Sequence, residues 1–167
     1  MNARHHLFGY ITAIVFVLGQ GCASQTSSPT VSESNLLATP FEAAQAAAIS
    51  EVFERNPTRK GYRNAYGAIF FIGVSSRTLD LVGSRIGKNL PRLDNDLTRF
   101  DKDRSFDEVT QRRALMLSVR TRSADPEAPI FAIGMASGPG TAVDFRVEMR
   151  KTDQTWKANS FQMVGVE

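Results

Sequence analysis

The sequence is poor in the side chains that most enzymes use for nucleophilic and metal-assisted catalysis. Its 167 residues include one cysteine, Cys22, and two histidines, His5 and His6. No imidazole occurs after residue 6, so the rest of the chain cannot support serine–histidine or cysteine–histidine catalysis. Zinc or copper sites built on imidazole are excluded for the same reason. A single cysteine allows no internal disulfide. We therefore predict neither a cofactor nor a metal site.

An excess of charge of either sign is also lacking. The formal net charge is +3, and it falls to +2 without residues 1–21, which carry Arg4. A net positive charge this small predicts no nucleic-acid partner. With 42% hydrophobic and 22% charged residues, the composition is typical of a globular protein, and the length suits one domain.

One hydrophobic run stands near the N-terminus. Residues 7–18 form an apolar stretch after a start that carries Arg4, and the small residues Gly19 and Gly21 precede Cys22. A charged start, a short apolar core and a small-residue cleavage site are typical of a secretory signal. A membrane span would need about 20 apolar residues. Residues 1–21 are therefore predicted to be a signal peptide.

The residues around Cys22 resemble a bacterial lipoprotein signal, in which a lipobox ends in the cysteine that is acylated and becomes the new N-terminus. Gly19 stands where that family has an aliphatic residue, and Leu18 lies one place earlier. The resemblance implies palmitate-type lipid attachment at Cys22 and export to the cell envelope. Because Ala23 and Ser24 are not aspartate, it implies the outer membrane if the bacterium is Gram-negative. Cleavage after Ala23 by ordinary signal peptidase and an uncleaved anchor stay open as alternatives.

Residues 22–39 are rich in serine and threonine, and their few apolar residues follow no clear period. Such a composition is typical of a disordered spacer. We therefore expect a lipid-attached tether over residues 22–39, followed by a single domain over residues 40–167.

The domain is predicted to be α+β. Thr39, Pro40 and Glu42 form a helix start with a capping box, and an apolar face continues to Arg55. A second short helix is expected over residues 78–87, where apolar residues recur at helical spacing. Strands are predicted at residues 66–74, 114–121, 130–136, 141–150 and from 155 onward.

Residues 141–150 alternate between apolar and charged side chains, which predicts one buried and one exposed face. In the last strand the apolar parity changes near Asn159, which predicts a bulge. The elements together predict an N-terminal helix packed on an antiparallel sheet of about five strands. From residue 66 onward, the pattern resembles cystatin-like and NTF2-like domains and small uncharacterised secreted bacterial domains. That resemblance implies no single activity.

Basic residues gather at the end of the first helix and after it. Arg55, Arg59, Lys60 and Arg63 lie close together in the chain, and such a cluster can contact anionic lipid headgroups or glycan phosphates. A solvated loop over residues 58–63 is the alternative.

The region 92–113 is the most charged part of the chain. The order D-x-D-x-S-x-D from Asp101 resembles an EF-hand loop, but Phe106 and Arg112 replace the glycine and the bidentate glutamate of that loop. We therefore predict no calcium site and expect a solvated connection with mutual ion pairs. The carboxylates nearest to predicted elements, and so the candidates for acid–base catalysis, are Asp80, Asp144 and Glu148.

These observations predict a lipid-anchored envelope protein that acts as a non-enzymatic binding or structural module. Its expected partners are the membrane, through the lipid, and an envelope protein or glycan. The alternative is a carboxylate-dependent enzyme that acts on envelope glycans. A further hypothesis places a small-ligand pocket between the helix over residues 41–55 and the sheet.

Overall fold

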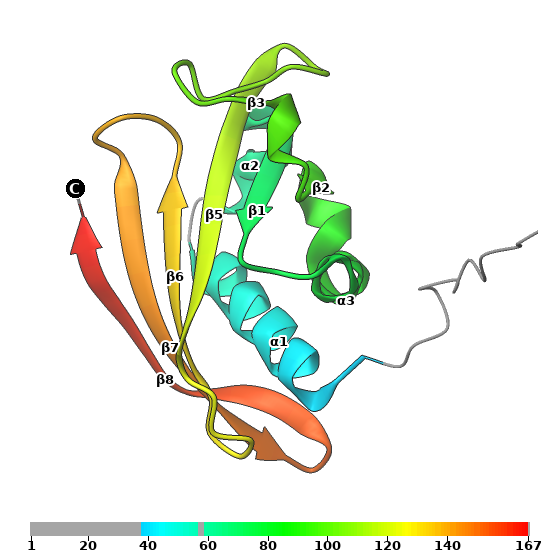
Figure 1. Cartoon of the computed structure of the whole chain (residues 1–167), viewed down its shortest axis with the longest axis vertical. Coiled ribbons are helices and arrows are strands. Elements are labelled where there is room, and N and C mark those ends of the chain that lie inside the picture. The colour runs from blue at the N-terminus through cyan, green and yellow to red at the C-terminus, as the bar shows by residue number, and fades with distance from the viewer. Residues whose placement is uncertain (1–37, 57–58, 167) are drawn as a thin grey trace, which may run out of the picture. The chain divides into compact units, whose positions relative to one another are not determined.

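The computed structural model describes residues 38–56 and 59–166 (Figure 1). The predicted signal peptide, Cys22 and the predicted tether up to residue 37 lie outside the described residues. No helix in the described part of the chain is long and apolar enough to cross a membrane. The helices are α1 (Pro40–Arg55), α2 (Arg59–Ala65) and α3 (Ser76–Ile86), with short 3-10 turns η2 (Gly87–Asn89) and η3 (Leu97–Arg99). The strands are β1 (Ala68–Ile72), β2 (Arg92–Asp94), β3 (Phe100–Asp101), β4 (Phe106–Asp107), β5 (Arg112–Ser123), β6 (Ile130–Ala136), β7 (Ala142–Thr152) and β8 (Thr155–Val166).

The fold is α+β, as predicted, but the sheet is mixed and has eight strands. Six strands follow the order β2-β1-β5-β6-β7-β8, and the β3–β4 hairpin joins β5 at one end. Strand β1 runs parallel to both β2 and β5, whereas β5 to β8 are antiparallel. The prediction of an antiparallel sheet of about five strands was therefore wrong in strand count and direction. The direction was wrong because α3 carries the chain back to the end of the sheet at which β1 begins, so that β2 runs parallel to β1.

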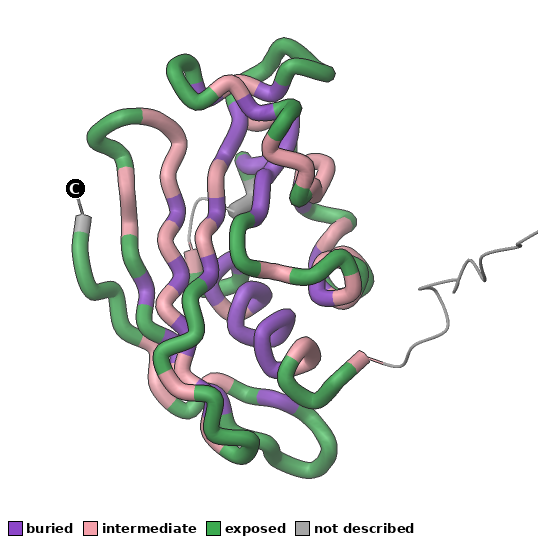
Figure 2. Tube along the Cα trace, viewed as in Figure 1, coloured by how far each residue is buried: buried purple, intermediate pink, exposed green. Residues whose placement is uncertain are grey.

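Helix α1 is the first described helix and not the N-terminal end of the chain. The predicted capping box is present: the Thr39 hydroxyl accepts from the Glu42 amide at 3.1 Å, and Glu42 accepts from the Thr39 amide at 2.9 Å. The helix is buried on most sides because it packs against both the sheet and α3, and its many alanines let these neighbouring elements come close. Figure 2 shows this buried stretch between the sheet and α3. Its fully buried members include Ala44, Ala46, Ala48, Ile49 and Val52.

Strands β5 to β7 each turn alternate side chains toward α1. Phe145, Val147 and Met149 of β7 are buried, which confirms the face predicted from alternation. The predicted bulge is present as well, because Glu148 pairs with Ser160 and Met149 with Ala158, which leaves Asn159 between them. A second irregularity follows at Asp144 and Phe145 of β7, opposite Val164.

Strand β1 is shorter than predicted. Ile69 and Phe71 pack with the helices, and Phe70 joins a second small apolar cluster with Phe100. Ile72 is 38% exposed, so the burial of this strand ends there. Gly73 then turns the chain at φ +79°, and a Cβ at this position would lie 2.2 Å from the Val119 carbonyl oxygen. Only glycine fits this turn without strain.

A polar junction joins α1 to the start of α3. The buried Gln45 amide donates to the Gly73 carbonyl at 3.0 Å, and its oxygen accepts from the Thr78 hydroxyl at 3.1 Å. The Ser75 hydroxyl donates to Glu42 at 2.7 Å. The pKa of Glu42 is lowered, first by this Ser75 hydrogen bond and then by the Thr39 amide. Helix α3 begins at Ser76, two residues before the predicted start at residue 78, and is capped by Ser75, while Thr78 is buried against Gln45.

Two connections hold more structure than expected. A solvated loop was one prediction for the basic stretch 58–63. Most of this stretch belongs to α2, because Tyr62 is buried with its ring 5.7 Å from the Phe53 ring. The charged region 92–113 contains β2, β3 and β4 and a buried carboxylate. Asp107 is 0% exposed and pairs with Arg92 at 2.7 Å.

The Asp107 carboxylate is held by several donors. Besides Arg92, it accepts from the Thr110 hydroxyl and from the amides of Val109 and Thr110. Burial raises the pKa of Asp107, but these hydrogen bonds and the Arg92 charge outweigh burial and hold that pKa below its ordinary value. The description of this region as a solvated connection was therefore wrong at its centre.

Replacing Asp107 by asparagine should lower the free energy of unfolding by about 1–3 kcal/mol at neutral pH, because buried donors lose a charged acceptor. Because folding lowers the pKa of Asp107, its contribution is full above the unfolded value of about 3.9 and is lost as the pH falls through the folded value. Urea unfolding over a pH series should show the difference between wild type and Asp107→Asn shrinking below about pH 4. The exposed Asp103→Asn variant is the control, and an equal loss in both variants would contradict the prediction.

Candidate functional site

The sheet face opposite α1 is open over β5 to β7. Two neighbouring rows of its side chains cross these strands, and the register fixes them. Ser118 pairs with Gly134, and Gly134 with Asp144. The next row joins Arg120, Ala132 and Arg146. All of these residues are exposed or half-buried, unlike their neighbours on the helix side.

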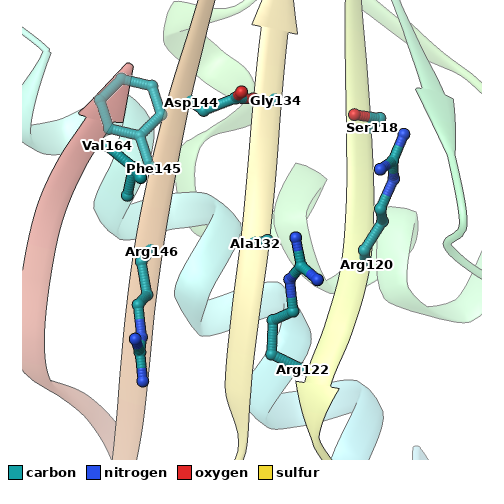
Figure 3. A pocket seen from close by; sticks show the side chains of 9 residues that line it. All are labelled: Ser118, Arg120, Arg122, Ala132, Gly134, Asp144, Phe145, Arg146 and Val164. Atoms are coloured by element: carbon teal, nitrogen blue, oxygen red, sulfur yellow. The ribbon is translucent and has the colours of Figure 1, made fainter.

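A pocket of about 480 Å³ lies on this open face. Its floor is β6, which contributes only Ala132 and Gly134, while β5 and β7 supply the polar walls (Figure 3). A methyl carbon placed on Gly134 would lie 2.7 Å from the Asp144 carboxylate and 2.8 Å from the Ser118 hydroxyl. The missing side chain therefore lets these two polar groups approach each other across β6.

The pocket carries an excess of positive charge. Arg120 and Arg122 of β5 and Arg146 of β7 line it, against the single carboxylate of Asp144. Within the described residues, none of the three guanidinium groups forms an ion pair, whereas Arg55, Arg92, Arg99 and Arg104 do. Like charges gathered at one site repel one another unless an anion lies between them. Arginine presents a planar fork of donors that suits carboxylate and phosphate oxygens.

The lining supplies binding chemistry and little else. It contains no histidine, lysine or cysteine. Ser118 is the only hydroxyl in it, and Asp144 is the only group that could accept its proton. The arrangement can hold an oxyanion through guanidinium and hydroxyl donors, but it offers no strong base for nucleophilic catalysis.

The structure describes the side chains of two members of the predicted basic cluster, Arg55 and Arg63. Arg55 pairs with Glu51 at 2.8 Å and lies 4.9 Å from the centre of the Phe161 ring. Arg63 donates to the Lys88 carbonyl at 3.0 Å. The two residues thus have separate local partners. The side chains of Arg59 and Lys60 lie outside the described residues.

The three candidate catalytic carboxylates do not converge. Asp80 is exposed on α3, while Asp144 and Glu148 lie on the open face of β7. Four residues along a strand separate the last two by about 13 Å, which exceeds the spacing of about 5–9.5 Å in two-carboxylate hydrolases. Glu148 instead accepts from the Asn159 amide at 2.9 Å.

The space between α1 and the sheet is filled by side chains. Ile49, Val52 and Phe53 of α1 are buried in the same apolar cluster as Leu117 and Ile133, so the small-ligand pocket expected there is replaced by core packing. A smaller hollow of about 260 Å³ lies instead at the start of α1, beside Phe41, Pro126 and Trp156.

The pocket lined by Arg120, Arg122 and Arg146 was not predicted from sequence. Asp144 and Arg146 were recognised as outward-facing residues, but Arg120 and Arg122 lie more than twenty positions earlier in the chain. The sequence of β6 could have indicated this pocket. Its outward residues are all small, whereas its inward residues are large: Ala132, Gly134 and Ala136 against Phe131, Ile133 and Met135.

No protein-family model, no curated protein and no solved structure matches this chain. The resemblances to lipoprotein signals and to cystatin-like or NTF2-like domains stay predictions.

Replacing Gly134 by alanine should change stability by no more than about 1 kcal/mol, because the added carbon displaces the ends of two side chains and no backbone. The substitution should separate the Ser118 hydroxyl from the Asp144 carboxylate, which a crystal structure or side-chain NMR would detect. Gly165→Ala is the matched control, since no atom lies within 4 Å of its added carbon. Unchanged rotamers of Ser118 and Asp144 in Gly134→Ala would contradict the prediction.

Proposed function

We propose that this protein is a non-enzymatic binding module of the bacterial cell envelope, which holds the anionic group of a ligand on the open face of its sheet. The observation that carries the proposal is the arginine pocket, defined as the hollow lined by Arg120, Arg122 and Arg146 over the small residues of β6. The three positive charges against one carboxylate favour a phosphate or carboxylate group.

The geometry of the strands supports this choice of ligand. Arg120 and Arg146 flank Ala132 in register, so their backbones lie about 10 Å apart across two strand spacings. In Figure 3 the Arg120 guanidinium lies toward Ser118 and the Arg146 guanidinium extends the opposite way along β7, so a change of rotamer is needed for both to reach one tetrahedral or planar oxyanion. Figure 3 shows the Arg122 guanidinium near Ala132, between β5 and β6. Because these arginines are exposed, binding should weaken as salt is added.

The envelope location rests on the predicted signal and on lipid attachment at Cys22. The first described residue lies 16 positions beyond Cys22, and a chain of that length reaches at most about 55 Å. A domain tethered in this way stays close to the membrane and to the glycans and lipids beside it, many of which carry phosphate or carboxylate groups. The proposed ligands are of this kind.

The non-enzymatic part of the proposal rests on what the pocket contains. Its lining holds no imidazole, thiol or amine, and the carboxylates considered for catalysis are about 13 Å apart or on a different element. A proposal of hydrolysis would need a second acid or base beside Asp144, and the lining residues supply none.

Arg120→Gln and Arg146→Gln should each weaken binding of ethyl phosphate by about tenfold, since a charge-assisted hydrogen bond contributes about 1.5–3 kcal/mol and exposure reduces that value. The measurement is an NMR titration at low ionic strength on the chain carrying Cys22→Ala. Arg85→Gln, an exposed arginine on α3, is the matched control and should bind as the parent does. Equal affinity in all variants, or no binding by the parent, would overturn the proposal.

Palmitate labelling in cells should be lost in Cys22→Ala, because no other thiol exists in the chain. The protein should then leave the membrane fraction. Ser24→Ala is the control and should keep its label. Persistent labelling of Cys22→Ala would contradict lipid attachment at this residue, while anion binding by the arginine pocket would stand unaffected.

A further inference from the structure

A second hollow of about 420 Å³ adjoins the arginine pocket on the same face of the sheet. Its lining is mostly apolar and comes from β5, β6, the end of β1, the β3–β4 hairpin and the turn after β6. We name it the apolar hollow, lined chiefly by Ile72, Phe100, Met116, Ala136 and Pro139.

The register places the two hollows side by side. Met116 pairs with Ala136 in the row next to Ser118 and Gly134, and the Arg120 row follows. Alternate residues of a strand share one face, so these three rows form one continuous strip. From Met116 to Arg120 the strip measures about 13 Å along β5. Between them lies Gly134, and the ends of the Ser118 and Asp144 side chains approach each other over it.

The strip changes character along its length. At one end Met116 and Ile72 present apolar surface, and Ile72 is 38% exposed although it is a large apolar residue. At the other end stand the guanidinium groups of the arginine pocket. Asp144 lies on the β7 side of the middle row, opposite to the β1 side where Ile72 lies. An anion is therefore repelled from the middle row, and an apolar chain can pass on the Ile72 side.

We infer that the ligand is a single-chain anionic amphiphile, whose phosphate or carboxylate head lies in the arginine pocket and whose alkyl chain lies in the apolar hollow. This inference rests on the proposed function and adds the class of ligand to it. A free, single molecule is favoured over the surface of a bilayer, because the tail site is a hollow within the sheet face, bounded by a hairpin and a turn. Lys102, the one cation of the apolar hollow, is exposed at its rim and can keep its ammonium in water while its stem covers the chain.

The test compares ethyl phosphate with decyl phosphate, below the concentration at which the latter forms micelles, on the chain carrying Cys22→Ala. Decyl phosphate should bind at least about a hundredfold more tightly with one molecule per chain, since each buried methylene increases affinity about fourfold. Ile72→Ser and Ala136→Leu should each reduce the affinity for decyl phosphate about tenfold or more and leave that for ethyl phosphate unchanged. The first removes apolar surface and the second fills the hollow.

Val109→Ser is the matched control for Ile72→Ser, because Val109 is 61% exposed and lies outside both hollows. Lys102→Gln should also leave the ratio of the two affinities unchanged. Arg120→Gln should reduce the affinity for both ligands.

The outcomes separate the two proposals. Equal affinity for ethyl and decyl phosphate would overturn the amphiphile inference and leave the anion-binding function standing. A preference for decyl phosphate that survives both Ile72→Ser and Ala136→Leu would also overturn the inference. Failure of decyl phosphate alone to bind would overturn only the amphiphile inference. Failure of ethyl phosphate to bind, or an affinity for decyl phosphate that is unchanged in Arg120→Gln, would overturn both.

Discussion

The burial of α1 against strands β5 to β8 determines which side of the sheet is available for a ligand. Ala44, Ala48 and Ile49 of α1 are buried in one apolar cluster with Leu117, Ile133 and Val147 of the sheet, so most of the large apolar side chains of β5, β6 and β7 face the helix. Because side chains alternate in a strand, a shift of one residue in β5 would exchange Leu117 for Ser118 and reverse both faces. The positions of Arg120 and Arg146 on the open face are thus set by the packing of the core on the other face.

The junction between α1, β1 and α3 fixes the position of β1 relative to the helix and to β5. Gln45 of α1 bonds to both the Gly73 carbonyl and the Thr78 hydroxyl, which places the end of β1 against the helix. Gly73 at the same time lies against the Val119 carbonyl of β5. These contacts hold β1 parallel to β5, and they put Ile72 beside Ser118. This pairing determines where the two hollows meet on the open face.

Features with a local cause could be predicted from sequence. The capping box at Thr39, the alternation in β7 and the bulge at Asn159 each depend on residues that lie close together in the chain, and each was confirmed. The parallel placement of β1, the helix α2 around Tyr62 and the buried Asp107 depend on distant partners, and these were missed. Asp107 is surrounded by charged residues in the sequence, and only its pairing with Arg92 and Thr110 shows why it is buried. The arginine pocket requires the register of three strands, which no single segment encodes.

The two irregularities in the pairing of β7 with β8, at Asn159 and at Val164, affect more than the geometry of the hairpin. Strand β8 forms one edge of the sheet, and an edge of twelve residues is a template on which a second chain can add a strand. Met163 and Val164 are 62% and 65% exposed, which would strengthen such an association. Bulges bend and twist the strand that contains them, so the outer edge of β8 does not offer a straight, evenly spaced row of amides and carbonyls. At high local concentrations of the protein, this irregular edge acts against the growth of intermolecular sheets.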